Sequence, residues 1–101
     1  MKQITLTKDQ LEAIKGKLND ADGEFYVEIE FEEFDGLMVQ AEGWRYIYGY
    51  VEASTDAYVV TSKEAFVELT GWQMNHVTEE DEEVEINPEN VKEIDEYLNA
   101  A

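Results

Sequence analysis

The clearest pattern in the sequence is an alternation of apolar and polar residues between positions 24 and 34, where the chain reads EFYVEIEFEEF. Apolar side chains occupy the odd positions from 25 to 31. A period of two is typical of a strand with one buried side and one side facing solvent. The even positions hold a tyrosine followed by an acidic row, which we define as Glu28, Glu30 and Glu32.

The alternation stops at Glu33 and Phe34, which predicts a turn. We expect residues 34–36 to form a three-residue hairpin loop in which Gly36 has a positive φ. In that register Glu33 would face Leu37, Phe31 would face Val39, and Ile29 would face Ala41. The apolar side chains of the two strands would then share one face of the sheet.

The return strand contains two apolar sets of opposite parity, separated by Gly43. A β-bulge at or beside Gly43 would bring both sets to the core face and leave Arg45 outside, next to the acidic row. In the alternative interpretation the aromatic residues lie on the far face and form an interface, although a core position is favoured. The odd set is Leu37, Val39 and Ala41, and the even set, the aromatic row, is Trp44, Tyr46, Tyr48 and Tyr50.

Two helices are predicted. A capping box of Thr7 and Gln10 indicates that the first runs from about residue 8 to about residue 18. The second begins after Asn87 as N-cap, with Pro88 in its first turn. Helices of about three turns are marginal alone in water, so both must pack on a sheet. Their apolar stripes are Leu11, Ile14 and Leu18 in the first helix, and Val91, Ile94 and Leu98 in the last.

The segments between the hairpin and the last helix predict further strands. AYVVTS (57–62) is typical of a strand, FVELTGWQM (66–74) of one or two more with a kink near Gly71, and VEI (84–86) of a last short one. The acidic cluster EEDEE, residues 79–83, is too polar for burial and is expected to join two strands. The chain is therefore predicted to be a single α+β domain over residues 1–101. Its meandering antiparallel sheet of about four to five strands would carry an N-terminal and a C-terminal helix on one face.

The net charge restricts the kind of partner that the protein is expected to bind. The chain holds 25 acidic and 7 basic residues, a net charge of -18, and residues 24–101 contain 21 of the acids but only three bases. A field of that sign repels nucleic acid and anionic lipid and attracts basic protein surfaces. We expect a basic protein partner, no direct nucleic-acid binding and no membrane binding.

The residues that most enzymes and metal sites need are scarce. The chain has no cysteine and one histidine, and it has no phosphate-binding glycine loop. Asp20, Asp22 and Gly23 do not match a calcium loop, because Leu18 and Ile29 would occupy its first and last ligand positions. We predict that the protein is not an enzyme and has no cofactor or metal. No apolar run is long enough for a signal peptide or a membrane span, so we expect a cytoplasmic protein.

The order of these features resembles small acidic α+β proteins of gut bacteria and their phages. The features are a capped helix first, strands between, and an acidic hairpin leading into a last helix that ends EYLNA. The resemblance implies no particular activity. Acidic mimics that block DNA-binding host proteins occur among phage products, and this favours the same class here.

Two functional hypotheses follow. In the first, the protein is a non-catalytic acidic binding module that engages a basic protein surface, with nucleic-acid mimicry as its sharpest form. Its surface would be the acidic row together with the acidic cluster: Glu79, Glu80, Asp81, Glu82 and Glu83. In the alternative, it is a structural or accessory protein that self-associates through the aromatic row.

Mimicry requires a high density of charge. Successive acids on one strand face are about 6.6 Å apart, whereas duplex DNA carries a charge every 1.7 Å or so of its axis. Acids from neighbouring elements would have to join the acidic row on the same side. The candidates are the acidic cluster and the acids of the last helix: Glu89, Glu93 and Glu96.

Overall fold

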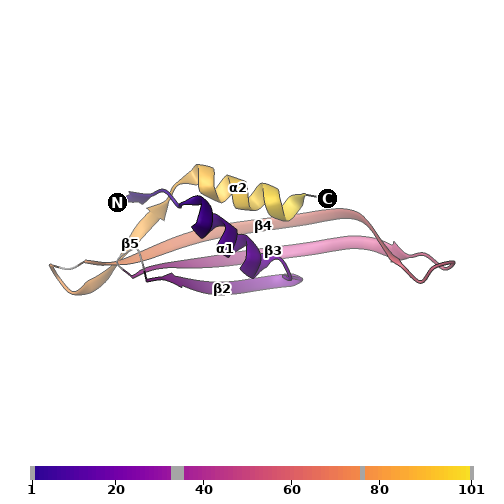
Figure 1. The fold of residues 1–101 in the computed structure, drawn as a ribbon, viewed down its shortest axis with the longest axis horizontal. Helices are drawn as coiled ribbons and strands as arrows, with labels where there is room; N and C mark the ends of the chain where they lie inside the picture. The colour runs from indigo at the N-terminus through magenta and orange to yellow at the C-terminus, as the bar shows by residue number, and fades with distance from the viewer. Residues whose placement is uncertain (1, 33–35, 76, 101) are drawn as a thin grey trace.

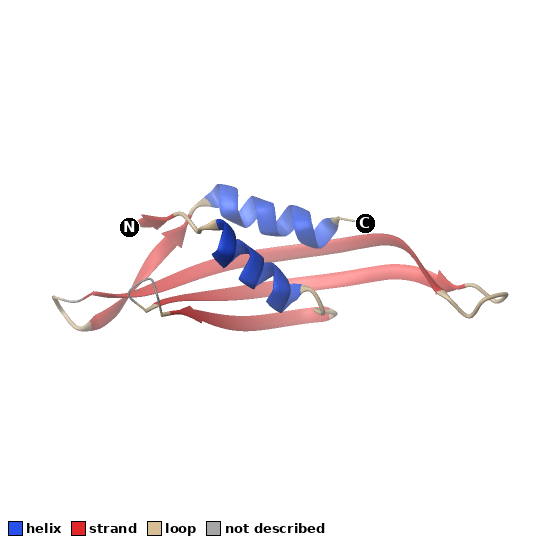
Figure 2. Cartoon of the chain, viewed as in Figure 1, coloured by secondary structure: helices blue, strands red, loops and turns tan. Residues whose placement is uncertain are grey.

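Both helices lie on the same side of a five-stranded sheet in the computed structural model, which describes residues 2–32, 36–75 and 77–100 (Figure 1). The strand order is β1-β5-β4-β3-β2, with β1 parallel to β5 and the other neighbours antiparallel. This confirms the predicted α+β class, and Figure 2 shows how the helices and strands separate into two layers. In chain order the elements are β1 (Gln3–Ile4), α1 (Lys8–Leu18), β2 (Gly23–Phe31), β3 (Leu37–Val51), β4 (Tyr58–Asn75), β5 (Glu80–Ile86) and α2 (Pro88–Asn99).

The two helices begin at the residues that the sequence predicts. The Thr7 hydroxyl accepts a hydrogen bond from the Gln10 main chain, and the Gln10 side chain accepts one from the Thr7 main chain at 2.8 Å. At α2 the Asn87 side chain accepts from the main chain of Glu89 at 3.0 Å. These contacts satisfy main-chain donors that a helix start would otherwise leave unpaired.

The core lies between the helices and the odd-numbered side chains of β2, β3 and β4. The helix stripes are its centre, with Ile14, Leu18, Ile94 and Leu98 fully buried. On the edge strand β2, Ile29 is buried, whereas Phe25, Val27 and Phe31 are only half-buried and pack against the margin of the core. Val91 of α2 is likewise half-buried. The prediction that all these side chains lie on the core side is thus right, but complete burial is limited to the centre.

The register of the first hairpin differs from the predicted one by two residues. Phe31 pairs with Leu37, Ile29 with Val39 and Val27 with Ala41. The predicted three-residue loop is therefore wrong, and Glu33, Phe34 and Asp35 lie outside the described residues. A shift of two keeps every side chain on its face, so alternation could not distinguish the two registers. Gly36 has a φ of +72°, as predicted.

The predicted bulge at Gly43 is wrong. Gly43 pairs regularly with Phe25 on one side and Val67 on the other. A glycine is required there for a different reason, since a Cβ atom would come within 1.9 Å of the Phe66 carbonyl oxygen. The regular register places the aromatic row on the face opposite Leu37, Val39 and Ala41.

Regular pairing also turns Arg45 inward, where we had expected it outside next to the acidic row. Its side chain is 5% exposed, and its Nη1 atom donates to the carbonyl oxygens of Leu18 at 3.4 Å and Asn19 at 2.8 Å. These carbonyls are at the C-terminal end of α1, where a cation is favourable. A charged side chain can therefore occupy a core position of β3.

A register shift that was not predicted occurs between Tyr48 and Gly49. Tyr48 pairs with Ser62 and Gly49 with Val60, so Thr61 of β4 is the additional residue. The Thr61 hydroxyl donates to the Tyr48 carbonyl oxygen at 3.1 Å. This bulge changes which side chains of β4 share a face with those of β3.

β4 runs without interruption from Tyr58 to Asn75, so the separate strands and the kink near Gly71 are not found. Gly71 pairs with Val39 on one side and Val84 on the other. The acidic cluster was expected to join two strands, but residues 80–83 belong to β5 and pair with β4. β1 was not predicted, because a strand of two residues leaves no periodic signal.

The far ends of β3 and β4 form an extension that we call the arm, residues 46–63, and we call the rest of the described chain the body. The pairing of β2 with β3 ends at Arg45, and β5 pairs with β4 only from Gly71 onward. The Asn99 side chain hydrogen-bonds to both the N–H and the carbonyl of Ala65, at 2.8 and 3.0 Å, as a neighbouring strand would. Beyond these contacts the arm projects past both helices, which explains the extents of 64 × 22 × 20 Å (Figure 1).

Candidate functional site

The sheet has one side covered by α1 and α2 and one side without a helix, which we call the helix-free face (Figures 1 and 2). β3 and β4 pair without a shift from the pair Met38–Trp72 to the pair Tyr48–Ser62. The even-numbered side chains of both strands therefore lie on this face. Glu28 and Glu30 of the acidic row thus share one surface with the aromatic row. Its side chains are Glu24, Tyr26, Glu28 and Glu30 of β2, Met38, Gln40, Glu42, Trp44, Tyr46 and Tyr48 of β3, and Ser62, Glu64, Phe66, Glu68, Thr70 and Trp72 of β4.

The acidic row is exposed along its length. Glu28 and Glu30 point outward from β2, and Glu32 lies in the turn that follows the strand. The Tyr26 hydroxyl donates to Glu28 Oε1 at 2.6 Å. That hydrogen bond, together with loss of hydration and the negative charges of Glu28 and Glu42, raises the pKa of Tyr26 above its ordinary value of 10.0.

The aromatic row is exposed, which makes the favoured core position wrong. Tyr46, Tyr48 and Tyr50 are 41%, 47% and 55% exposed, and Trp44 is half-buried. The Trp44 ring stacks with Tyr46 at 5.6 Å and with Phe66 at 6.4 Å between centroids. Partial loss of hydration, and then the nearby Glu64 carboxylate, raise the pKa of Tyr48. Of the row, only Trp44 belongs to the body, while the three tyrosines belong to the arm.

Two successive rows of side chains across the sheet line an open hollow of about 540 Å³ on the body. One row is Glu24, Trp44 and Phe66, and the next is Tyr26, Glu42 and Glu68. Phe25 and Gly43 complete the lining. The two rows contribute three carboxylates and three aromatic rings, and the lining of the hollow contains no basic side chain.

Two of the carboxylates in this hollow belong to directly paired residues, and no basic side chain lines the hollow. Glu42 and Glu68 are direct neighbours across β3 and β4. Like charges in that position destabilise a sheet. The ion pairs of the described residues, both made by Lys15, are on the helix side instead. A cation in the hollow would therefore remove an unfavourable interaction as well as form favourable ones.

Sequence reasoning singled out Trp44 but missed the other five side chains of the two rows. The missed residues are Glu24, Tyr26, Glu42, Phe66 and Glu68. An alternation with a period of two could have identified them, because it continues through FVELT (66–70) as it does through the first strand. The alternation was not extended across β4 because Gly71 and the turn residues suggested separate, shorter strands.

The acidic cluster is divided by the pleat of β5. Asp81 and Glu83 pair with Met74 and Trp72 and so point to the helix-free face, at the far edge from the acidic row. Glu80 and Glu82 point to the opposite side, where Glu82 accepts a hydrogen bond from the Asn75 amide at 2.9 Å. Glu79 lies in the preceding turn with a φ of +60°. The predicted cluster is thus not one continuous acidic surface.

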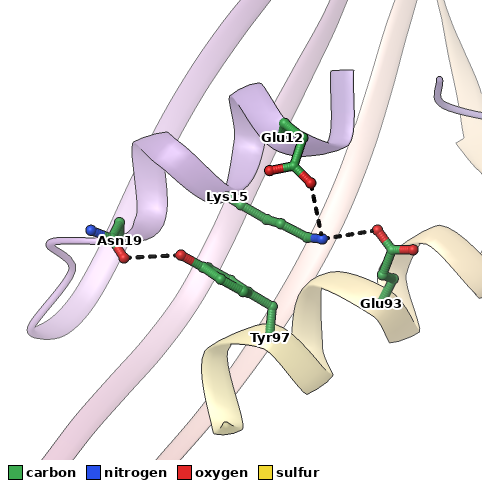
Figure 3. A network of polar contacts seen from close by, with 5 residues as sticks. All are labelled: Glu12, Lys15, Asn19, Glu93 and Tyr97. Carbon is green, nitrogen blue, oxygen red and sulfur yellow. Dashed lines mark hydrogen bonds and ion pairs between the residues drawn. The ribbon is translucent and has the colours of Figure 1, made fainter. Parts of the chain in front are cut away.

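Polar contacts on the other side of the sheet join the two helices (Figure 3). The Nζ atom of Lys15 in α1 lies 3.1 Å from Oε2 of Glu93 in α2 and 3.7 Å from Oε1 of Glu12. The same atom lies 5.5 Å from the centroid of the Tyr97 ring. The Glu93 carboxylate is the main cause of the raised pKa of Lys15. The Tyr97 hydroxyl donates to Asn19 Oδ1 at 2.9 Å. These contacts position α1 against α2.

Within residues 2–32, 36–75 and 77–100, no group of three or more histidine, cysteine, aspartate or glutamate side chains is arranged to hold a metal ion. None of the helices in those ranges is long and apolar enough to cross a membrane. Comparisons of the chain with protein-family models, with curated proteins and with solved structures give no match. The function must therefore be inferred from the geometry of the surface.

Proposed function

We propose that the protein is a non-catalytic binding module that engages a basic protein surface through the helix-free face of its body. The observation that supports this most directly is the hollow lined by Glu24, Glu42 and Glu68 together with aromatic rings. Carboxylates and aromatic faces are the two kinds of group that attract a guanidinium or ammonium ion. Alternating them on an open sheet face suits a partner that presents arginine or lysine.

A basic side chain in the hollow has several sources of favourable energy. Its cation can bond to the carboxylates of Glu42 and Glu68, which otherwise repel each other across the strands. Its position near Trp44 and Phe66 adds a cation–π interaction of about 0.5–2 kcal/mol. The alkyl stem of the same side chain can pack on the rings. Arginine fits better than lysine because its planar fork binds carboxylates in pairs and stacks on aromatic rings.

Nucleic-acid mimicry is the narrower form of this proposal. Neighbouring strands are about 4.8 Å apart, so acids from three strands are denser than the acidic row alone. The acids of α2 do not contribute, because that helix lies on the other side of the sheet (Figure 1). In this form the occupied surface of the partner is the one that otherwise binds DNA or RNA.

The proposal is tested with an arginine-rich peptide and two variants of equal net charge. The double variant Glu42→Gln/Glu68→Gln removes two charges from the hollow, and the control Glu89→Gln/Glu96→Gln removes two exposed charges from α2. Titration calorimetry should show at least about tenfold weaker binding, or about 1.4 kcal/mol, for the hollow variant than for the control. Affinity should fall as salt rises. Equal losses in the two variants would mean attraction by net charge alone and would contradict the proposal.

Nucleic-acid mimicry is tested by a separate measurement after a basic partner has been identified. If the partner uses its nucleic-acid-binding surface, duplex DNA should displace it from the module in competition experiments. A ternary complex of partner, DNA and module would contradict mimicry while leaving the binding of a basic surface intact.

A further inference from the structure

The arm consists of the ends of β3 and β4, which pair only with each other among the described residues. No described strand pairs with residues 46–63 from outside the arm, because β2 pairs with β3 only as far as Arg45 and β5 pairs with β4 only from Gly71 onward. Figure 1 shows this ribbon extending alone from the end of the body. An isolated two-stranded ribbon is marginally stable at best in water. A ribbon of this length would gain stability from a further surface packed against it.

The arm is also where apolar surface is concentrated. Of the eleven large apolar side chains that are exposed in the described part of the chain, six belong to these 18 residues. They lie on both sides of the ribbon, because the bulge at Thr61 changes the alternation of β4. On one side are Tyr46, Tyr48 and Tyr50, and on the other Val51, Tyr58 and Val60. Exposed apolar surface gathered in this way is typical of an interaction site.

The arm differs from the body in charge. It contains Glu52, Asp56 and Lys63, so its net charge is -1, and the remaining -17 belongs to the other residues. A basic partner would gain little from it, since all but two of the 25 acidic residues belong to the rest of the chain. The arm is therefore a second surface, with a chemistry unlike that of the hollow.

We propose that the arm associates with the arm of a second copy of this chain. Two copies repel each other strongly if their bodies meet, and least if they meet at the nearly neutral ends. Two antiparallel arms that overlap along their strands hold the bodies about 20 Å apart, since six residues of strand span about that length. This exceeds the Debye length of about 8 Å at physiological ionic strength, so the repulsion is largely screened. The same patch on both copies gives a closed two-fold dimer.

This dimer should respond to salt in the opposite direction from the binding of a basic partner. Salt screens the repulsion between the two acidic bodies, so self-association should become tighter as salt rises from about 10 mM to about 150 mM. A narrow ribbon buries a small area, which places the dimer at the weak end of specific interfaces. The two proposals thus succeed or fail independently.

Sedimentation velocity over a range of concentrations tests the dimer. The wild type should form dimers whose dissociation constant decreases with salt, and the double variant Tyr48→Thr/Tyr50→Thr should weaken them at least about tenfold. Threonine keeps a high strand propensity, so the ribbon is not lost. The control Met74→Thr/Val77→Thr removes two exposed apolar side chains from the body and should dimerise like the wild type. A wild type that stays monomeric up to about 1 mM, or equal effects of the two double variants, would overturn the proposal.

A second measurement does not depend on these substitutions. The chain has no cysteine, so Ser62→Cys on the arm and Lys8→Cys at the start of α1 each introduce a single thiol for a spin label. Between the two copies of a dimer, pulsed electron resonance should give a shorter label distance at position 62 than at position 8. The reverse order would show that the bodies, not the arms, form the contact.

Discussion

The Nη1 atom of Arg45 donates a hydrogen bond to the carbonyl oxygen of Asn19 at 2.8 Å, which joins the middle of the sheet to the end of α1. The same atom lies 3.4 Å from the Leu18 carbonyl oxygen. Leu18 is the last residue of α1 and Asn19 is its C-cap, and carbonyl groups at this end lack partners within the helix. Arg45 thus bonds to carbonyl groups at the end of α1 while its side chain occupies a core position of β3.

Replacing this residue should therefore destabilise the fold. Arg45→Met leaves the Asn19 carbonyl without this donor, whereas the Leu18 carbonyl still accepts from the main-chain N–H of Ala21 at 3.1 Å. We expect a loss of about 1–3 kcal/mol in the free energy of unfolding. Urea denaturation followed by circular dichroism measures it. The control Lys92→Met removes the same charge from an exposed position of α2 and should change stability by less than about 0.5 kcal/mol. Similar losses in both variants would mean that only net charge matters.

Two glycines should respond to alanine in opposite directions. At Gly43 a Cβ atom would meet the Phe66 carbonyl oxygen at 1.9 Å, whereas at Gly16 it would meet nothing within 4 Å. We expect Gly43→Ala to lower the stability by about 1–3 kcal/mol or more, because main-chain atoms must move. Gly16→Ala, inside α1, should raise it by about 0.5–1 kcal/mol. Thermal unfolding of both variants gives the comparison, and a tolerated Gly43→Ala would contradict the close approach of β3 and β4.

Repulsion between the carboxylates of the hollow should lower the free energy of unfolding of the free protein. Glu68→Gln removes one of the two like charges that face each other across β3 and β4, and we expect a gain of about 0.2–1 kcal/mol. The control Glu30→Gln changes a carboxylate that faces Met38 on the same side of the sheet. Added salt should reduce the difference between the variants, because it screens the repulsion. A loss of stability in Glu68→Gln would indicate a favourable interaction of this group.

Tyr26 should titrate above its ordinary pKa of 10.0, because its hydroxyl donates to Glu28 and ionisation would place two negative charges side by side. The difference in phenolate absorbance between the wild type and Tyr26→Phe isolates this group. Glu28→Gln should move the midpoint back toward 10.0. Since the pKa is raised in the folded state, this contact stabilises the protein below pH 10 or so and is lost as the pH rises through the higher value. An unchanged midpoint in Glu28→Gln would mean that the hydrogen bond does not persist in solution.

The sequence predicted the elements that depend on neighbours along the chain. Thr7 with Gln10, and Asn87 with Pro88, mark helix starts because capping is a contact over two or three residues. The period of two from Phe25 to Phe31 predicted a strand and its core side. Gly36 was correctly assigned a positive φ. Each of these features is decided within a few residues.

Features that depend on distant residues could not be read in this way. The hairpin register was wrong by two because such a shift leaves every face unchanged. The inward position of Arg45 required partners in α1, 26 residues away for Asn19. Without that knowledge, a bulge at Gly43 was the natural means of burying the aromatic row.

The sequence by itself therefore determined the class of fold, the helix starts, the inner side of β2 and the excess of acidic residues. Only the tertiary structure decided that Glu28 and Glu30 share the helix-free face with the aromatic row and that Glu42 is paired with Glu68. It also decided that no other described strand pairs with the arm. The physical reason is that local patterns specify how each element alternates. Which strands pair, and where the pairing ends, is decided by packing between residues far apart in the chain.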